Sequence, residues 1–201
     1  MLTKKENTVI NIIVGLIMLG LLGWFILVVD VNGKASIYDV QKSKNLTTKY
    51  GEIIIGACDN YWEKTAAGDS VDSMNMEGLD DVKFLVLAES GGAINLHDWQ
   101  KRIDKEYRAK SSSDHLIVIC VNEIEDVIEQ CWYTNSGVTN TIQDIVDLFF
   151  INPQTGSLMK SVTLTGEMPD DCPSSHSRDK HGDFDNKLFD NAVSEFISKL
   201  P

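Results

Sequence analysis

A group of histidine and aspartate residues near the C-terminal end of the chain has the composition of a metal site. Its members are His176, Asp179, His181 and Asp183. The last three alternate as the first ligands of a calcium loop do, but Phe184 stands at the sixth place, where that loop needs glycine. Imidazole nitrogens suit zinc or copper better, with the two histidines and one aspartate as ligands. The competing interpretation is a solvated acidic loop. We favour the loop, so no metal ion and no cofactor are expected.

The cysteines are the second set of residues with possible chemistry. Cys58, Cys120, Cys131 and Cys172 are too widely spaced for a Cys-x-x-Cys redox or zinc motif. Two structural disulfides are the favoured interpretation, and four cysteines permit three pairings. The alternatives are a buried free thiol at Cys120, which lies in an apolar run, and a reactive thiol. Disulfides indicate an oxidising compartment.

No other set of residues predicts catalysis or nucleic-acid binding. His97 and His115 stand beside the ends of expected elements without a recognisable serine or cysteine nucleophile motif. Residues 87–92 follow an apolar run but lack the Gly-x-Ser-x-Gly pattern of a nucleophile elbow. The formal net charge of −12 repels phosphate backbones. The sequence therefore favours a protein that is not an enzyme and has no nucleic-acid partner.

The segment that places these residues in the cell is an apolar run near the N-terminus. Residues 9–29 contain no charged side chain, and 21 helical residues span roughly 31 Å, the thickness of a hydrocarbon core. A cleaved signal peptide has a shorter apolar region. Lysines lie on both sides of the run, so the cysteines decide the orientation. The sequence predicts a single-pass signal-anchor, with a cytoplasmic tail at 1–8, a membrane span at 9–29, a juxtamembrane tether at 30–48 and an extracytoplasmic domain at 49–201.

Apolar runs in this domain predict a sheet. Ile37 and Val40 can begin a strand, and residues 53–55 predict a short buried one between two glycines. Residues 82–87 predict the next strand, and 116–121 a strand in the centre of the sheet. A polar turn at 122–126 then leads to an antiparallel strand at 127–133.

The remaining patterns predict a hairpin and two helices. Residues 153–156, Pro-Gln-Thr-Gly, are typical of a turn, and join strands at 145–152 and 158–164. In the second strand Leu158, Lys160, Val162 and Leu164 should face one way. Trp99, Ile103 and Tyr107 fall four apart in a helix that opens at Asn95 or His97, and residues 187–200 form an amphipathic C-terminal helix. The expected fold is α+β, a mainly antiparallel sheet with one or two helices packed on one face.

Short motifs in the second half of the chain occur in a familiar order. Ile119-Cys120-Val121 is followed by Cys131-Trp132-Tyr133, by Phe-Ile-Asn-Pro-Gln-Thr-Gly at 150–156, by Gly-Glu-Met-Pro at 166–169, by Cys172-Pro173 and by the terminal helix. This order resembles a loosely defined set of bacterial hypothetical proteins with extracytoplasmic domains behind an anchor or signal. It covers a little under half of the chain. The resemblance implies location and fold, with no assigned activity, and a Cys131–Cys172 disulfide bracketing the hairpin.

Together these patterns favour a membrane-anchored extracytoplasmic domain that acts by protein contact. We expect an accessory or structural subunit of an envelope or membrane assembly, with lipid contacts through residues 9–29 and a protein partner. The alternative is a metal- or ligand-binding ectodomain, possibly enzymatic, that uses His176, Asp179, His181 and Asp183. Metal content separates the two hypotheses.

Overall fold

The computed structural model describes residues 37–62, 81–90, 93–112, 114–133, 137–172 and 179–201. The predicted tail and membrane span, residues 1–29, lie outside these ranges. Within them, no helix has both the length and the apolar character needed to cross a membrane.

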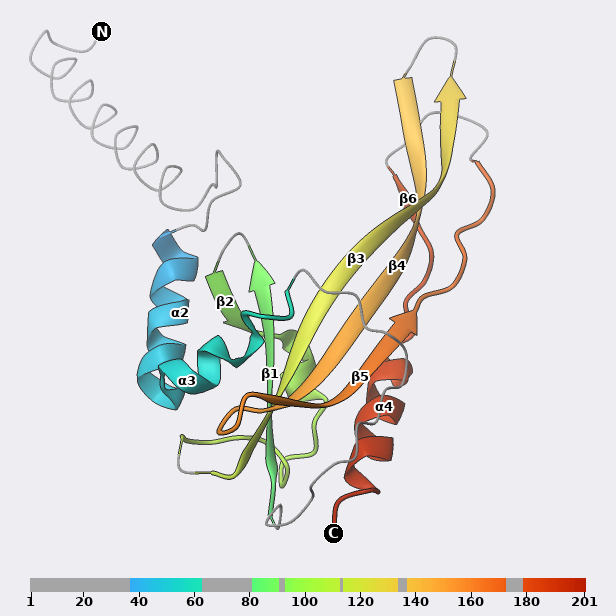
Figure 1. The fold of residues 1–201 in the computed structure, drawn as a ribbon. Coiled ribbons are helices and arrows are strands. Elements are labelled where there is room, and N and C mark those ends of the chain that lie inside the picture. The colour runs from blue at the N-terminus through green and yellow to red at the C-terminus, as the bar shows by residue number, and fades with distance from the viewer. Residues whose placement is uncertain (1–36, 63–80, 91–92, 113, 134–136, 173–178) are drawn as a thin grey trace, which may run out of the picture.

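The described residues form an α+β fold around a mixed sheet (Figure 1). The strands are β1 (Lys83–Ser90), β2 (Ala93–Leu96), β3 (Leu116–Tyr133), β4 (Gly137–Asn152), β5 (Ser157–Thr165) and β6 (Lys180–His181). Their order is β2-β1-β3-β4-β5, and β6 pairs with β4 outside this path. The β1–β3 and β4–β6 pairs are parallel and the other pairs antiparallel. The α+β prediction is confirmed, and the sheet is mixed.

The central place of β3 was predicted correctly, but its length was not. The expected turn at 122–126 does not exist, because β3 runs unbroken through it and pairs with β4 as far as Tyr133 and Gly137. The only irregularity is a register shift between Val127 and Glu129. Cross-strand hydrogen bonding therefore outweighs the polar composition that suggested a turn.

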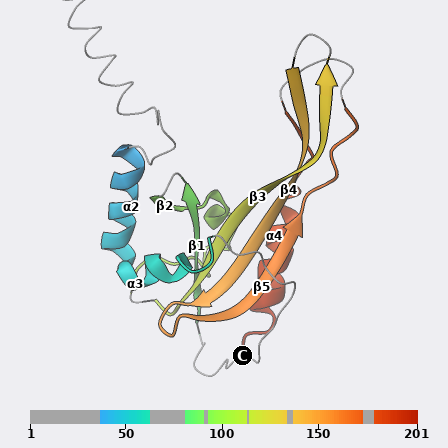
Figure 2. The same cartoon turned by 45° about the horizontal axis from the view of Figure 1, so that its top comes forward.

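Helices cover both faces of the sheet, whereas one covered face was expected (Figure 2). On one face lies α4 (Lys187–Ile197), the predicted amphipathic helix, with Phe189 and Phe196 fully buried. On the other lie α2 (Ile37–Tyr50), α3 (Glu52–Ile55) and the 3-10 turn η1 (Gly56–Cys58). Alternate residues of β3 feed the two cores, Ile117 and Ile119 toward α4, Val118 toward α3.

Two N-terminal strand predictions were wrong because the sequence did not show that helices cover a second face of the sheet. The strand start expected at Ile37 and Val40 is the beginning of helix α2, in which Leu46 and Tyr50, four apart, pack against the core. The expected strand at 53–55 is helix α3. Ile54 and Ile55 are buried there while Ile53 is 76% exposed, a pattern of helical rather than alternating burial.

The predicted helix around Trp99 is only the 3-10 turn η2 (Asp98–Lys101), preceded by strand β2. The segment is held against β1 by hydrogen bonds from a side chain. The Gln100 side chain accepts a hydrogen bond from the Val86 N–H (2.6 Å) and donates one to the Phe84 carbonyl (3.0 Å). These contacts satisfy the backbone of β1 beyond the end of β2. Trp99 is still buried, in the core beneath α4.

The β4–β5 hairpin was predicted correctly, except for the face of the sheet toward which Leu158 points. A register shift between Phe150 and Ile151 turns Leu158 toward the α3 side, whereas Val162 and Leu164 face α4. Lys160 also faces α4, where its buried ammonium group lies 3.2 Å from Glu195.

Candidate functional site

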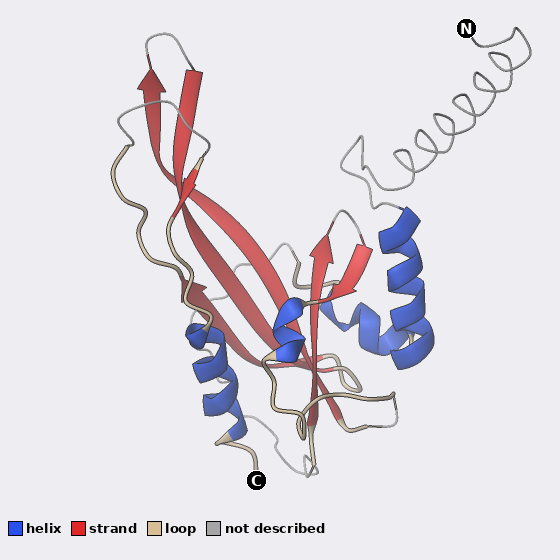
Figure 3. Ribbon diagram, turned by 180° about the vertical axis from the view of Figure 1, so that it is seen from behind, coloured by secondary structure: helices blue, strands red, loops and turns tan. Residues whose placement is uncertain are grey.

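The ribbon of β3 and β4 extends beyond the other strands as a projecting arm (Figures 1 and 3). We define the arm as residues 123–133 of β3 and 137–146 of β4. Pairing between β1 and β3 ends at Val121, so beyond this point β3 has β4 as its partner strand within the described chain. The rest of the sheet, with its helices, is called the body.

A cleft of about 400 Å³ lies where the arm leaves the body, on the face that carries α4. It is lined by Trp99, Phe184, Asn186, His181 and six arm residues, Glu123, Ile124, Glu125, Asp144, Ile145 and Val146. None of these lining residues is a lysine or an arginine. The cleft is therefore acidic, with histidine as its only basic side chain type.

Two histidine–carboxylate pairs stand at this cleft. The His97 Nε2 atom lies 3.1 Å from Glu123 Oε1, and the His181 Nδ1 atom lies 3.0 Å from Asp144 Oδ1. The hydrogen bond from His97 lowers the pKa of Glu123. The hydrogen bond to Asp144 raises the pKa of His181, and the charges of nearby carboxylates add to it. The lowered pKa favours an ionised Glu123 beside His97, and the raised pKa favours a protonated His181 beside Asp144.

Aromatic rings form the body side of the cleft. Trp99 stacks on Phe184 with ring centroids 5.7 Å apart, and its indole N–H donates to Asn186 Oδ1 at 2.7 Å. His97 meets Trp99 edge to face at 4.8 Å. Residue spacing placed Trp99 on a helix face, but its contacts with Phe184 and Asn186, which are far away in the chain, could not be read from spacing.

Strand β6 brings His181 to the cleft. It pairs with β4 through Thr141–Lys180 and Ile142–His181, and the Gly182 N–H donates to the Ile142 carbonyl at 3.0 Å. A Cβ atom at Gly182 would lie 1.9 Å from the Glu167 carbonyl oxygen, so only glycine fits between these backbones. In the sequence, Gly182 indicates that two backbone segments approach closely at this point. It does not indicate that Glu167 lies on the other segment.

The structure describes three of the four predicted metal ligands. His176 lies outside the described residues. Asp179 accepts a hydrogen bond from the Asn140 N–H (2.8 Å), and His181 pairs with Asp144. The Asp183 carbonyl accepts from the Glu167 N–H (2.8 Å). Over the described part of the chain, the ligand atoms of these residues do not converge on a common point.

Both predicted disulfides are present. Cys58 joins Cys120 with a Cα–Cα distance of 5.5 Å, and Cys131 joins Cys172 at 5.6 Å. The alternative of a free buried thiol at Cys120 is wrong. The first bond ties η1 to β3 in the body, and the second ties β3 of the arm to the segment after β5.

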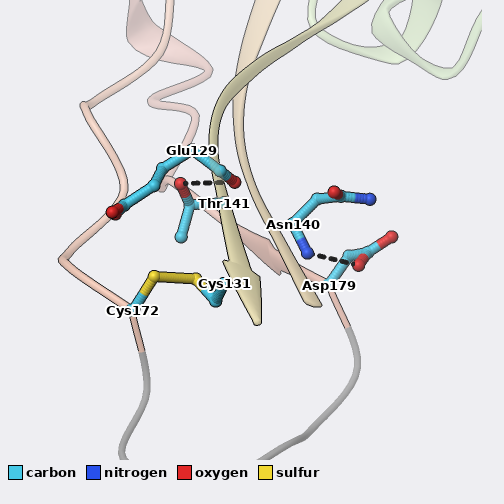
Figure 4. Close-up of a disulfide and its surroundings, with 6 residues drawn as sticks. All are labelled: Glu129, Cys131, Asn140, Thr141, Cys172 and Asp179. Atoms are coloured by element: carbon cyan, nitrogen blue, oxygen red, sulfur yellow. Dashed lines mark hydrogen bonds between the residues drawn. A yellow bond between two sulfur atoms is a disulfide. The ribbon is translucent and has the colours of Figure 1, made fainter. Parts of the chain in front are cut away.

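One group of possible metal ligands does converge, namely Glu129, Cys131 and Cys172 (Figure 4). Its two sulfur atoms are bonded to each other, so neither is a thiolate that can bind a metal ion. Figure 4 also shows the contacts beside this disulfide, Thr141 Oγ1 to the Glu129 carbonyl (3.4 Å) and Asn140 N–H to Asp179. The group is structural.

The distal part of the arm exposes apolar side chains. Trp132 is 77% exposed, Val127 46% and Ile128 41%. On the opposite face, Cys131, Thr139 and Thr141 are at most 3% exposed. Sequence analysis missed this surface because apolar residues in an expected strand usually face a core.

The side chains that line the cleft can bind polar or charged groups. Its carboxylates accept hydrogen bonds, and the imidazole ring of His181 can donate them.

Comparison of the chain with models of protein families, with curated proteins and with solved structures finds no match. The resemblance to bacterial extracytoplasmic domains therefore stays a prediction from the sequence motifs.

Proposed function

We propose that this protein is a membrane-anchored extracytoplasmic domain that acts by protein contact, as an accessory or structural subunit of an envelope or membrane assembly. The observation that carries the proposal is the apolar surface of the arm, with Trp132 77% exposed at its distal end. Exposed tryptophan is costly in water and is enriched among the residues that dominate protein–protein binding.

The register of the arm places two exposed apolar residues, Trp132 and Val127, on the same face. Trp132 pairs with Val138 and Val127 pairs with Ile142, and within each strand these residues point to the face that carries α4. The other face is covered, since Thr139 is fully buried near the Cys131–Cys172 disulfide. A surface held rigid in this way loses little entropy when a partner binds.

The expected anchor supports the same function. Only seven residues, 30–36, separate the predicted span from the start of α2, and seven extended residues reach at most about 25 Å. The domain would therefore work close to the membrane surface. The two disulfides support an oxidising compartment and thus an extracytoplasmic domain.

Site-specific photo-crosslinking in intact cells tests the contact. A photo-reactive residue at position 132 should give a discrete crosslinked protein. The same residue at position 105 should give none, because the exposed Lys105 lies near Arg108, which pairs with Phe84 at the opposite end of the sheet. Absence of an adduct at 132, or the same adducts at both positions, contradicts the proposal.

Protease treatment tests the topology. Protease added outside intact cells should cut residues 30–201 while leaving the first eight residues protected. Alkylation of the denatured, unreduced protein should modify no cysteine, because both pairs are bonded. Four reactive thiols, or a protected domain, contradict the extracytoplasmic placement.

The alternative function, a metal- or ligand-binding ectodomain built on His176, Asp179, His181 and Asp183, keeps one supporting observation. His181 lines the cleft, beside the carboxylate of Asp144. Metal analysis of the purified full chain tests it. One equivalent of zinc, copper or calcium that is lost in a His176→Ala, His181→Ala variant would replace the contact proposal.

A further inference from the structure

The acidic cleft and the apolar surface of the arm belong to one continuous face. In the β3–β4 register Glu123 pairs with Val146, Glu125 with Asp144 and Val127 with Ile142, and side chains at these alternate positions share a face. Beyond the bulge the same face continues to Trp132 and Val138. A segment that lies along the arm face therefore passes over the cleft.

The cleft has negative charge that the protein itself does not neutralise. Glu123 and Asp144 each have a histidine partner, whereas Glu125 is exposed and acts on His181 only through its charge, with neither an ion pair nor a hydrogen bond from its side chain among the described contacts. The remaining charged arm residues, Asp126 and Glu129, are also acidic and exposed, and they lie at register positions of the opposite face. A positive group from outside the chain is the complement of this site.

The aromatic residues of the cleft indicate which class of cation the cleft can bind. Trp99 and Phe184 are stacked and line the cleft opposite the carboxylates of the arm. Aliphatic stems of arginine and lysine pack on such apolar surfaces, and guanidinium groups stack on aromatic rings and bind carboxylates in pairs. A bare divalent ion would need converging ligand atoms, which the described residues of the cleft do not provide.

We propose that the cleft receives an arginine or lysine side chain from the protein partner that contacts the arm, so that the partner segment is basic at one end and apolar at the other. This inference rests on the proposed contact function and names the chemistry of the partner. A second copy of this chain is a poor occupant, because the arm of the copy would bring Glu123 and Glu125 against like charges. The cleft volume of about 400 Å³ is large enough for a side chain.

Binding of a minimal probe to the full chain in detergent micelles tests the cleft. The probe is Nα-acetyl-arginine amide, and the matched control is Nα-acetyl-citrulline amide, which has nearly the same shape without the charge. The indole N–H resonance of Trp99 and the ring resonances of His181 report on the site. Saturable shifts are expected with the arginine probe, and at least about tenfold weaker binding with the citrulline control.

Glu125→Gln is the decisive variant, because Glu125 has no described side-chain partner whose loss would disturb the fold. It should weaken binding of the arginine probe several-fold, while Trp132→Ser, at the distal end of the arm, should leave it unchanged. Equal shifts from both probes, or unchanged binding in Glu125→Gln, overturn the inference. Stoichiometric displacement of the probe by calcium or zinc chloride also overturns it, in favour of a metal site.

Crosslinking from position 132 in cells connects the cleft to the partner. Charge reversal in Glu125→Lys should reduce the adduct several-fold, whereas Lys105→Glu at the opposite end of the sheet should not. If the adduct forms normally in Glu125→Lys, the basic partner is refuted while the contact function stands. If the arginine probe binds but position 132 gives no adduct, the contact function fails, and with it the assignment of the cleft to a protein partner.

Discussion

The body and the arm are built on the same two strands but are stabilised differently. In the body both faces of β3 and β4 are covered, so that Ile119, Cys120 and Phe150 are fully buried between α4 and α3. In the arm, one face is covered by the segment that the Cys131–Cys172 disulfide joins to β3. On the other face Trp132 and Val127 are exposed to solvent. The body provides stability, and the arm provides a rigid exposed surface.

The difference begins in the sequence of β3. Residues 116–121 are apolar without interruption, which suits a strand covered on both sides, whereas acidic residues begin at Glu123. Pairing with β4 continues through this change, so the strand persists although its helical cover ends. Four predictions examine this division, from the largest expected effect on stability to the smallest.

Removing a core ring from the body should have the largest effect. Phe150 is fully buried and stacks on Phe196 of α4 with centroids 4.6 Å apart. Phe150→Ala should lower the free energy of unfolding by about 3–5 kcal/mol through lost burial and the cavity left behind. Chemical denaturation measures it. A loss under about 1 kcal/mol would show that α4 does not close the core as described.

Removing the arm disulfide should have a comparable but localised effect. The Cys131→Ser, Cys172→Ser variant loses a cross-link over 41 residues, worth about 3–4 kcal/mol by chain entropy. Hydrogen exchange should rise mainly in the arm and in residues 166–172. The matched control, Cys58→Ser with Cys120→Ser, should instead affect α3 and the body. Equal exchange patterns in the two variants would refute the division.

The His181–Asp144 pair should give the arm base a small pH dependence. The carboxylate raises the pKa of His181 in the folded state, so the pair stabilises fully below the pKa of the unfolded chain, and the contribution is lost as pH rises through the folded pKa. In His181→Gln the free energy of unfolding should fall by about 0.2–1 kcal/mol at acidic pH and be unchanged well above the folded pKa. Denaturation at several pH values measures it. A deficit that grows with pH would contradict the assigned pairing.

Trp132→Ser should affect stability least and contact most. The side chain is mostly in solvent, so the free energy of unfolding should change by no more than about 0.5 kcal/mol. Crosslinking from position 127, on the same face of the arm, should nevertheless fall strongly. A loss of stability above about 2 kcal/mol would mean that Trp132 is a core residue, and unchanged crosslinking that it is not part of the contact.

Local patterns were sufficient for elements whose partners are near in the chain. The hairpin around residues 153–156 and helix α4 follow from turn chemistry and from apolar spacing, which depend on neighbouring residues. The four cysteines likewise indicated two disulfides, although their spacing left the pairing open. Predictions failed where the deciding contact was distant. The turn η1, directly after helix α3, is joined to β3 through Cys58, and the side chain of Gln100 forms a hydrogen bond with β1. Local propensity therefore did not decide either segment.

The sequence by itself determined the apolar run at 9–29, the acidic charge, the central strand and the terminal helix, because each is a property of consecutive residues. Only the tertiary structure decided that the cleft exists. Its walls come from residues 123–125 and 144–146 of the arm and from Trp99, His181, Phe184 and Asn186. Their proximity depends on the register of β3 with β4 and on the passage of β6 beside them. This register cannot be read from residue spacing along the chain, because it depends on which faces of the strands are buried by the helices.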